Sequence, residues 1–446
     1  MRSVGPGAKR HDCPGLVDRT SRGPGRRRPP RGAGSLALAQ MGPSGDSPRR
    51  RGDGPGAQAL AAWLERNAVD SLPAGDLQRK LDLGRPLRVK LGIDPTAPDI
   101  HLGHTVVLQK LREFQDAGHV VVLIIGDFTA RIGDPSGRSE TRPVLSTAQI
   151  EHNARTYQEQ AHAILDRERV EVRRNSEWLD MTMEELFRLA RSMTVSQLIE
   201  REDFATRLRE GVPVALLELF YPLMQGYDSV AVRADVELGG TDQKFNLLRA
   251  RDIQRSYGQD EQAIMTMPLL PGTDGKRRMA KSLGNYVGVS EPPGEIYGKT
   301  LSVPDGALET WYSLLLGTSP PRELDARDAK RALARALVAR FYGEEAASAA
   351  EQEFDRVHIG HEPPTDIPSI RWPAEDEAVH LPALLADAFS ITTSEARRSL
   401  SQGAVRIEGE RVSNGTLDVP LEQVAGKVLQ LGKRRFARVR VVGPAG

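Results

Sequence analysis

Residues 87–125 of the 446-residue chain read LRVKLGID, PTAPDI, HLGHTVVLQKLREFQDAG and HVVVLII. Residues 87–94 alternate and favour a strand, and the prolines at 95 and 98 end it in a loop. Apolar residues recur at helical spacing over 100–117, with Asp99 expected as the N-cap and Gly118 beyond the C-terminus. The apolar run 120–125 suits a buried parallel strand. The stretch predicts a βαβ unit with a right-handed crossover.

The start of this helix carries His101-Leu102-Gly103-His104. A helix N-terminus offers free N–H groups and partial positive charge, which suit a phosphate. Gly103 lets a ligand approach the backbone, and imidazoles three residues apart share a face and can donate to a phosphate chain. Taken alone, the pair could equally be two surface or core histidines. No GxGxxG motif accompanies the unit, so the dinucleotide-binding version of the fold is not supported.

A second candidate element lies far along the chain, at residues 271–286, which read PGTDGKRRMAKSLGNY. Glycines and small polar residues predict a mobile loop, and its four basic residues include Arg278 and Lys281. Such a loop can close over a polyphosphate and stabilise charge that develops in the transition state. The alternative for this loop alone is a solvated basic turn.

Together the two segments resemble the paired signatures of class I aminoacyl-tRNA synthetases. His101–His104 is similar to the HIGH signature, and Arg278-Met279-Ala280-Lys281-Ser282 is similar to KMSKS, with Arg278 in place of the first lysine and Ala280 in place of the first serine. The resemblance spans nearly all of 60–446 and narrows to the bacterial-type tyrosyl-tRNA synthetases. It is carried further by the segments GIDPTAPD at 92–99, GDPSG at 133–137, YPLMQGYD at 221–228 and GGTDQ at 239–243.

Three residues of one segment suggest a pocket wall even without the resemblance. Tyr221, Gln225 and Asp228 are spaced i, i+4 and i+7, so they share one helix face that is too polar for a core. The resemblance implies that Tyr221 and Gln225 hold the amino group of tyrosine and that Asp228 accepts from the phenolic OH. It also implies that Asp134 binds the ammonium, although Asp134 lies in a turn-forming sequence, and that Gln243 lines the same pocket.

The resemblance assigns the nucleotide as well. It implies that Asp94, Thr96, His101 and His104 face the triphosphate of ATP and that Gly103 lies under the adenine. Gly240 and Asp242 would meet the ribose, and Arg278 and Lys281 would close on the pyrophosphate. One departure concerns Lys90, because many family members have a tyrosine there as a second partner of the phenolic OH. Lys90 cannot accept that hydrogen bond, and we expect it to point elsewhere, as a subfamily trait.

Charge and composition divide the chain. Residues 1–55 hold 12 Lys+Arg against 4 Asp+Glu, together with 11 Gly and 8 Pro, and we expect a disordered basic tail or an extended translation start before Met41. No apolar run approaches the roughly 20 residues needed to cross a bilayer, and no secretory core follows the N-terminal charges. The single cysteine, Cys13, excludes a disulfide framework and a thiolate metal cluster. We expect a cytoplasmic protein.

We expect an α/β protein with a Rossmann-like, parallel-sheet catalytic domain at 56–288. By resemblance, a dimerisation segment is inserted at about 145–215, and a helical anticodon-stem domain at 289–357 follows. Prolines and weak periodicity predict a linker at 358–379, where His358 and His361 are not expected to bind a metal. Residues 380–446 resemble the small RNA-binding module of ribosomal small-subunit protein four, with two helices and a hairpin at 403–412. Its candidate phosphate-binding residues are Arg397, Arg398, Lys433, Arg434 and Arg435.

The resemblance implies a tyrosine–tRNA ligase that uses L-tyrosine, ATP and tRNA(Tyr) and forms a homodimer. Mg²⁺ would arrive with ATP, and no dedicated metal site or tightly bound cofactor is expected. Two alternatives remain open at this point: a tryptophan-specific relative of the same class, and an RNA-binding protein that keeps the fold without catalysis. Asp228 and the C-terminal module favour the tyrosine enzyme over the tryptophan-specific relative. His101, His104 and Lys281 argue against an RNA-binding protein without catalysis.

Overall fold

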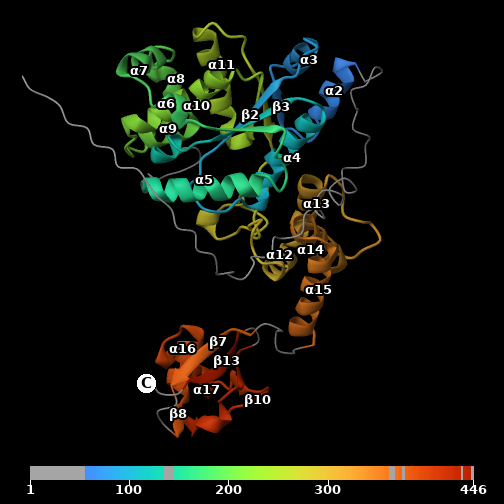
Figure 1. The fold of residues 1–446 in the computed structure, drawn as a ribbon, viewed down its shortest axis with the longest axis vertical. Helices are drawn as coiled ribbons and strands as arrows, with labels where there is room; N and C mark the ends of the chain where they lie inside the picture. The colour runs from blue at the N-terminus through green and yellow to red at the C-terminus, as the bar shows by residue number, and fades with distance from the viewer. Residues whose placement is uncertain (1–55, 135–144, 361–366, 374–376, 433–434, 443–446) are drawn as a thin grey trace, which may run out of the picture.

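The computed structural model describes residues 56–134, 145–360, 367–373, 377–432 and 435–442. The expected basic tail, His361, Lys433 and Arg434 lie outside these residues. In Figure 1 an α/β layer, a helical bundle and a small C-terminal domain follow one another along the long axis of the molecule. The fold class expected from the sequence is confirmed.

The α/β layer is built on a six-stranded sheet of order β1-β6-β5-β2-β3-β4. All neighbouring pairs are parallel except β1 with β6. In register, Val89 of β2 lies opposite Val121 of β3 and Val236 of β5. The strands are β1 (Asp70–Leu72), β2 (Arg88–Ile93), β3 (Val120–Ile125), β4 (Val170–Arg174), β5 (Val236–Gly240) and β6 (Ala263–Met267).

The strand order has its switch point at β2. The chain runs from β2 outward to β3 and β4, and then returns to place β5 on the other side of β2. In open α/β sheets this leaves a crevice at the carboxyl ends of the two strands that flank the switch. The residues that follow β2 and β5, beginning with Asp94 and Thr241, therefore border the crevice.

The predicted βαβ unit is confirmed: β2 and β3 flank α4, which runs over Leu102–Asp116. Buried Leu102, Leu108, Leu111 and Phe114 carry the helix onto the sheet. Gly118 has φ +87°, as expected beyond a helix C-terminus. The other helices of the layer are α2 (Ala57–Leu64), α3 (Asp76–Leu81), α5 (Thr147–Ala161), α6 (Ser176–Leu179), α7 (Met183–Ala190), α8 (Val195–Ile199), α9 (Glu202–Arg209), α10 (Leu216–Val232) and α11 (Lys244–Ser256).

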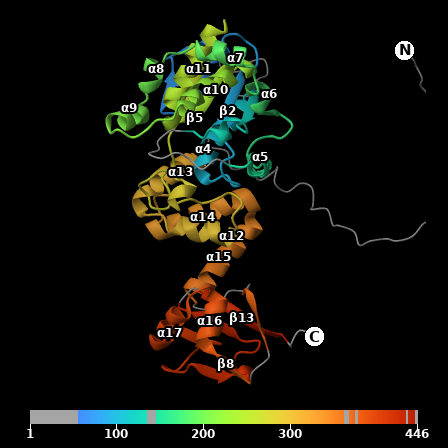
Figure 2. The ribbon, with the colours of Figure 1, turned by 90° about the vertical axis from the view of Figure 1, so that its left-hand side faces the viewer.

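One strand lies inside the segment at about 145–215 that we expected to be inserted into the catalytic domain. Residues 170–174 form β4, which pairs with β3 at the edge of the sheet. Charged residues alternate with Val170 and Val172, as is common in a short edge strand. Part of 145–215 therefore belongs to the main sheet, and the helices α7, α8 and α9 follow it along the same flank as α10 (Figure 2).

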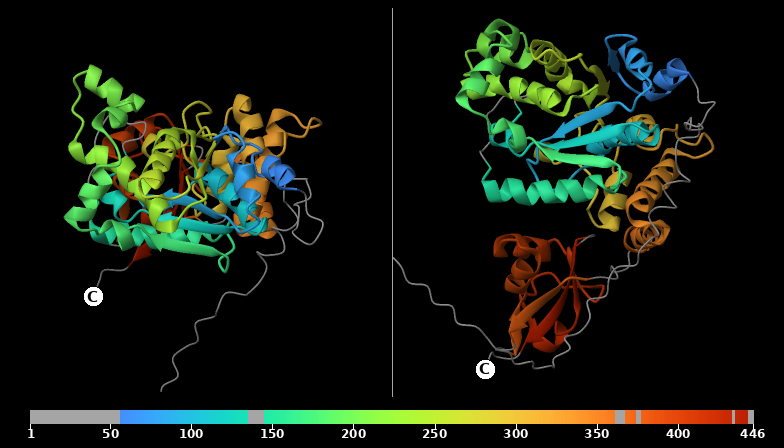
Figure 3. Two further views of the ribbon diagram at one scale, coloured as in Figure 1. Left: turned by 90° about the horizontal axis from the view of Figure 1, so that it is seen from above. Right: turned by 45° about the horizontal axis from the view of Figure 1, so that its top comes forward.

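The bundle that follows consists of α12 (Pro293–Leu301), α13 (Leu308–Leu316), α14 (Ala326–Tyr342) and α15 (Glu344–His358). Its buried residues, such as Trp311 and Leu333, join one continuous apolar core with α4 and the sheet. The bundle is thereby fixed to the α/β layer, and Figure 3 shows it, in orange, against that layer.

The C-terminal domain has an apolar core of its own. Helices α16 (Leu381–Phe389) and α17 (Thr393–Ser401) match the two expected, and β9 (Val405–Ile407) and β10 (Glu410–Arg411) form the expected hairpin. Glu408 and Gly409 turn it with positive φ values of 49° and 83°, as a tight two-residue hairpin loop requires. The remaining strands are β11 (Asp418–Pro420), β12 (Val428–Leu431) and β13 (Arg435–Val442).

The linker predicted at 358–379 is wrong in part. Ser369–Pro373 forms β7, which pairs in parallel with β13, and Ala378–His380 forms β8, which pairs with β11. Ile370 and Trp372 pack against the C-terminal core, while the alternate residues Ser369, Arg371 and Pro373 are exposed. The prolines of this segment argued against a strand and hid the alternation. Pro373 is the last residue of β7, and it is tolerated there because β7 lies at the edge of its sheet.

Among the described residues, no helix is both long and apolar enough to span a membrane.

Candidate active site

The two histidines lie at the mouth of the crevice. His101 is the N-cap of α4, and its backbone N–H donates to Nδ1 of His104 at 3.2 Å. The two rings stack with centroids 3.8 Å apart. The expected N-cap, Asp99, is wrong, because Ile100 and Leu102 bond to the chain at 287–289 and keep it extended as far as His101.

Both imidazoles are held in the neutral form. Burial, reinforced by the charges of His104 and Lys281, lowers the pKa of His101 to about 2. Burial and Lys281 lower the pKa of His104 to about 4. Because Nδ1 of His104 accepts a hydrogen bond, its proton lies on Nε2. That tautomer leaves His104 with an N–H donor and no net charge.

Gly103 cannot be replaced without movement. A Cβ at this position would lie 3.0 Å from two atoms of the His101 ring and 3.6 Å from Cβ of Met279. The contact with Met279 shows that the loop of the second signature lies directly beside the first. Glycine is therefore needed here to keep the stacked histidines in place. This role is in addition to the predicted close approach of a ligand to the backbone of Gly103.

Main-chain hydrogen bonds join the start of α4 to residues 287–289, which directly follow the basic loop. Leu102 N–H donates to Val287 O at 2.9 Å, and Val289 N–H donates to Ile100 O at 2.9 Å. Lys281 Nζ lies 3.6 Å from Asp99 Oδ2, and burial lowers the pKa of this lysine. The convergence of residues 101–104 with 278–282, which the functional interpretation requires, is thus present in the fold.

Asn285 holds the basic loop together. Its Oδ1 accepts from the N–H of Ala280 at 2.9 Å, and its Nδ2 donates to Asp274 at 3.0 Å and to Arg278 O at 3.1 Å. A Cβ at Gly272 would lie 2.3 Å from this amide, so the loop closes tightly around Asn285. The loop has a defined path that presents Arg278 and Lys281 to the crevice.

Arg278 closes one side of the crevice. Its Nη1 lies 2.6 Å from Asp242 Oδ2, and both side chains are partly buried. Burial raises the pKa of Asp242, and Arg278 opposes that rise. At Gly240, two residues before Asp242, a Cβ would lie 2.6 Å from Asp242 Oδ1 and 2.8 Å from the Leu269 side chain. The end of β5 and the basic loop thus meet where the resemblance predicts ribose and phosphates.

A chain of hydrogen bonds connects Asp94, which is predicted to face the nucleotide, with Asp228, which is predicted to bind the phenolic OH. Tyr221 OH donates to Asp94 Oδ2 at 2.9 Å, and Thr129 Oγ1 donates to Asp94 Oδ1 at 2.7 Å. Asn175 Nδ2 bonds to Thr129 at 2.9 Å and reaches Asp228 Oδ2 at 3.5 Å. Asp94 therefore binds Tyr221 and Thr129 in this structure, and its contact with ATP stays a prediction.

Asp228 is buried at the far end of this chain. Trp178 Nε1 donates to its Oδ1 at 2.8 Å. Burial raises the pKa of Asp228 to about 7, while Lys90, Trp178 and Asn175 act to lower it. Burial beside the aspartates also raises the pKa of Tyr221 well above its usual value, so the phenol stays protonated.

The remaining predicted tyrosine-binding residues line the same crevice. Gln243 Nε2 donates to Asp134 Oδ2 at 2.8 Å, which brings the segment that follows β3 to the residues that follow β5. Gln225 follows Tyr221 by one turn of α10, and its Nε2 lies 3.5 Å from Glu237 Oε1. Thr96 lies in the loop after β2, where its N–H donates to Asp94 O at 2.8 Å.

The predicted RNA-binding residues lie apart from the crevice, in the C-terminal domain. Arg397 and Arg398 are exposed on α17. Arg435 donates to Phe389 O at the end of α16 and lies over the Phe389 ring at 5.2 Å. Arg435 therefore has a structural partner that the sequence did not indicate.

Sequence reasoning missed the residues that hold the functional side chains in place: Thr129, Asn175, Trp178, Glu237 and Asn285. They lie outside the recognisable motifs or within them as unremarkable polar residues. Only the isolated polar position of Glu237 in the apolar strand Val236–Gly240 gave a signal in the sequence.

Comparisons with known proteins bear on this geometry. The family model described as tRNA synthetases class I (W and Y) matches residues 82–358. A tyrosine–tRNA ligase of Moorella thermoacetica is 52% identical over 394 residues, which cover 84% of this chain and 94% of the relative. A tyrosine–tRNA ligase of Thermotoga maritima is 49% identical over 390 residues, covering 84% and 96%.

The chain belongs to the class I tRNA synthetases of the W and Y group. The resemblance drawn from the two signatures is thereby confirmed. Among solved structures, tyrosyl-tRNA synthetase of Archaeoglobus fulgidus in complex with L-tyrosine is similar, with a TM-score of 0.54 and 22% identity over 66% of this chain and 99% of that one. The enzyme of Aeropyrum pernix has a TM-score of 0.53 and 21% identity, covering 67% and 98%. These distant likenesses show the synthetase fold.

The depressed pKa of His104 predicts how stability depends on pH. An unfolded histidine takes up a proton near pH 6.5, whereas folded His104 does so near pH 4. The unfolded state therefore binds more protons between these values, and this histidine lowers stability as pH falls through that window. His104→Asn should lose less stability than the wild type between pH 7 and pH 4.5, measured by urea unfolding.

His152→Asn, a change at an exposed position of α5, is the matched control and should keep the wild-type pH slope. Equal slopes for His104→Asn and the wild type would show that His104 is not held neutral by burial.

Proposed function

We propose that this synthetase is a tyrosine–tRNA ligase. It activates L-tyrosine with ATP to tyrosyl-adenylate and pyrophosphate, and then transfers tyrosine to the 3′-terminal adenosine of tRNA(Tyr). The observation that carries the proposal is the crevice itself, in which the two signature segments meet and which a chain of hydrogen bonds connects, from Asp94, to the buried carboxylate of Asp228. Relatives named tyrosine–tRNA ligase, at 52% and 49% identity and nearly full length, support tyrosine over tryptophan.

The pocket chemistry fits the amino acid. An ammonium suits a site with Asp134 and Asp94 near Tyr221, because these carboxylates compensate its charge. Asp228 keeps acceptor capacity beyond the bond from Trp178, since a carboxylate accepts about four hydrogen bonds. A phenolic OH fills that capacity, and phenylalanine would leave it unpaired at a cost far larger than that of a missing methylene.

The first step needs no protein nucleophile. A carboxylate oxygen of tyrosine attacks the α-phosphorus of ATP, the bond from that phosphorus to the bridging oxygen breaks, and pyrophosphate leaves with the electron pair. The protein contributes by holding the two reactants in line and by compensating the charge on the leaving group. Neutral His101 and His104 act as hydrogen-bond donors, and Arg278 and Lys281 supply fixed positive charge.

Mg²⁺ belongs to the substrate in this proposal. Among the described residues, no cluster of three or more His, Cys, Asp and Glu side chains is placed to hold a metal. The ion would therefore be carried by the phosphates of ATP, as is usual for Mg²⁺. In the second step the ribose hydroxyl of tRNA attacks the carbonyl carbon of the adenylate and AMP leaves. We place both steps in the cytoplasm.

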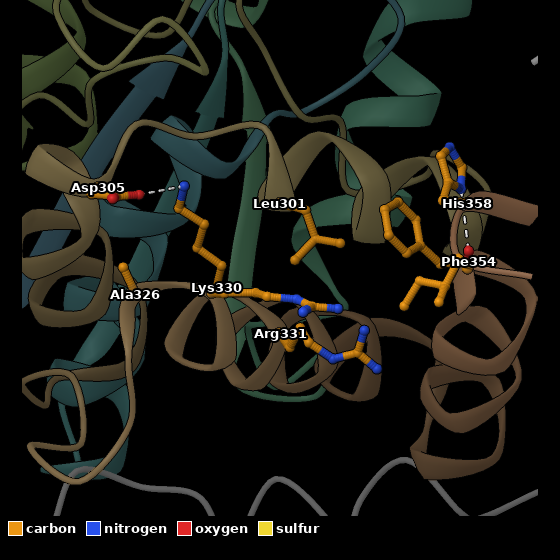
Figure 4. Close-up of a pocket in the computed structure, with 9 residues that line it drawn as sticks. Leu301, Asp305, Ala326, Lys330, Arg331, Phe354 and His358 are labelled. Atoms are coloured by element: carbon orange, nitrogen blue, oxygen red, sulfur yellow. Dashed lines mark hydrogen bonds and ion pairs between the residues drawn. The ribbon is translucent and has the colours of Figure 1, made fainter. Parts of the chain in front are cut away.

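Two surfaces support tRNA binding. A cavity of about 410 Å³ opens in the bundle between α12, α14 and α15, and Figure 4 shows Lys330, Arg331, Phe354 and His358 around it. Lys330 bonds Asp305 at 2.6 Å, and the aromatic rings of Phe354 and His358 stack at 4.1 Å. Cationic groups beside aromatic faces suit RNA. Arg397 and Arg398 supply a second, exposed basic surface on α17.

Exposed apolar side chains on the helices at one flank of the α/β layer support a homodimer. We call them the apolar patch: Met183, Phe187, Val195, Leu208, Leu216 and Leu217, each at least half exposed. Monomers rarely expose so many large apolar side chains together, and a two-fold axis would let the same patch cover its copy. The patch lies on α7, α8, α9 and the start of α10, within or beside the segment expected to form the dimer.

Amino-acid-dependent ATP–pyrophosphate exchange by the purified chain tests the proposal. We expect exchange with tyrosine and none with tryptophan or phenylalanine. Lys281→Ala should slow exchange by about 10²–10³-fold, because it removes a cation aimed at the leaving group. Lys276→Ala, at an exposed position of the same loop, should leave the rate unchanged. Stimulation by tryptophan would select the tryptophan enzyme, and no exchange with any amino acid would leave an RNA-binding protein.

The role of the C-terminal domain can be separated from catalysis. Replacing Arg397 and Arg398 together by alanine should lower kcat/KM for tRNA charging by about tenfold or more and reduce its salt dependence, since two phosphate contacts are lost. Tyrosine-dependent exchange should not change. Arg155→Ala with Arg255→Ala, exposed positions of the α/β layer, is the matched control. A uniform loss in both assays would contradict a specific role in RNA binding.

The dimer proposal predicts a clear change in mass. Leu216→Asp with Leu217→Asp places two charges in the apolar patch and should give a monomer in sedimentation velocity. Leu83→Asp changes an isolated leucine of similar exposure, 51%, and should leave the dimer intact. A wild-type monomer at micromolar concentration would refute the interface.

A further inference from the structure

Lys90 is buried without any exposure at the centre of the sheet. It lies on β2, and its Nζ contacts Glu237 Oε1 on β5 at 2.8 Å. The same nitrogen donates to Gln225 O at 2.9 Å and to Ser229 Oγ at 2.8 Å, both on α10. An ammonium has three N–H donors, so these acceptors use all of them.

Two of the three partners of Lys90 lie on one turn of α10. Gln225 and Ser229 are the ends of this turn, and Asp228, the acceptor proposed for the phenolic OH, lies between them in the sequence. Glu237 also accepts from Ser229 Oγ at 3.1 Å and from Gln262. The ion pair thus ties β2 and β5 to the turn of α10 that carries Gln225 and Asp228, two of the three residues of the polar pocket wall.

We propose that Lys90 is a specificity-determining positioning residue of the tyrosine pocket, which fixes the 225–229 turn of α10 and places a buried positive charge behind Asp228. The inference rests on the proposed tyrosine activation. With its donors fully used, Lys90 does not contact the substrate. It acts through Asp228, by keeping that side chain in place and in the carboxylate form that accepts most strongly from an OH.

The charges around Asp228 predict in which direction its pKa should move when Lys90 or Glu237 is replaced. The groups that face it are Lys90 from β2, Glu237 from β5, Trp178 and Asn175 from α6 and its N-cap, and Tyr221 on the same helix. Burial raises the pKa of Asp228 to about 7, the charge of Lys90 opposes the rise, and Glu237 adds to it. Loss of Lys90 should therefore raise this pKa further, and loss of the Glu237 charge should lower it.

The test uses Lys90→Met, Glu237→Gln and the wild type, with tyrosine- and phenylalanine-dependent exchange measured from pH 6 to pH 9. Lys90→Met should reduce the tyrosine-to-phenylalanine ratio of kcat/KM at pH 7 by about tenfold or more, the equivalent of one pKa unit. The acid limb of the tyrosine profile should move up by about one pH unit in Lys90→Met and move down in Glu237→Gln. Opposite shifts are not expected from a general loss of packing.

Lys80→Met is the matched control. Lys80 is also fully buried and bonds Asp260 at 2.9 Å, but it lies on α3, outside the pocket. This variant should lose stability while its tyrosine-to-phenylalanine ratio and acid limb stay those of the wild type. If Lys80→Met changes the ratio as much as Lys90→Met does, the effect is one of stability and the proposal is overturned.

The remaining outcomes distinguish a failure of the role proposed for Lys90 from a failure of the proposed function. A folded Lys90→Met with an unchanged ratio and limb overturns the inference while the wild-type exchange keeps the proposed function. Absence of tyrosine-dependent exchange in the wild type removes the proposed function first. If Lys90→Met does not fold, Glu237→Gln decides, and an acid limb that fails to move down overturns the role of the buried charge.

Discussion

Main-chain pairing between residues 100–102 and 287–289 is the constraint on which the site depends. These short hydrogen bonds join segments nearly 190 positions apart and bring the start of α4 next to the basic loop. Without them, the stacked histidines and Lys281 would belong to different surfaces. The pairing also explains why α4 begins at Leu102, because the chain ahead of it is committed to the bridge. This one long-range pairing therefore sets both where α4 begins and which residues border the crevice.

The crevice is organised by a second device, the hydrogen-bond chain from Tyr221 through Asp94, Thr129 and Asn175 to Asp228. It crosses the carboxyl ends of β2 and β3 and reaches α10, so the two halves of the site cannot move independently. Gly126 shows how tight this arrangement is, since a Cβ there would lie 2.1 Å from Asp94 Oδ1. The carboxylates are held in place by the protein's own donors.

Much of the fold could be predicted because local and global signals agree. The βαβ unit, the polar face of α10, and the C-terminal helices and hairpin follow from periodicity and turn chemistry. Predictions failed where tertiary pairing determined the structure. The N-cap of α4 is His101 and not the predicted Asp99, and β4 and β7 were not predicted because charged residues and prolines obscure their alternation. These two edge strands are specified by their partners, β3 and β13, more than by their own sequences.

The site divides in the same way. Residues that would touch the ligands could be named, because their motifs are short and distinctive. Residues that hold them, such as Trp178 and Asn285, could not, because a single buried donor leaves no periodic trace in a sequence. Lys90 falls between the two groups: the sequence showed that it departs from many relatives, and only the structure showed that Glu237 and α10 use all of its donors.

We propose that the two signature segments and the carboxylate of Asp228 act on one bound molecule. A crystal structure of the chain with a non-hydrolysable tyrosyl-adenylate analogue would show this. We expect the phosphate of the analogue between the start of α4 and Lys281, with its phenolic OH bonded to Asp228. An analogue bound with its phosphate away from residues 101–104, or with its phenol directed toward solvent, would contradict it.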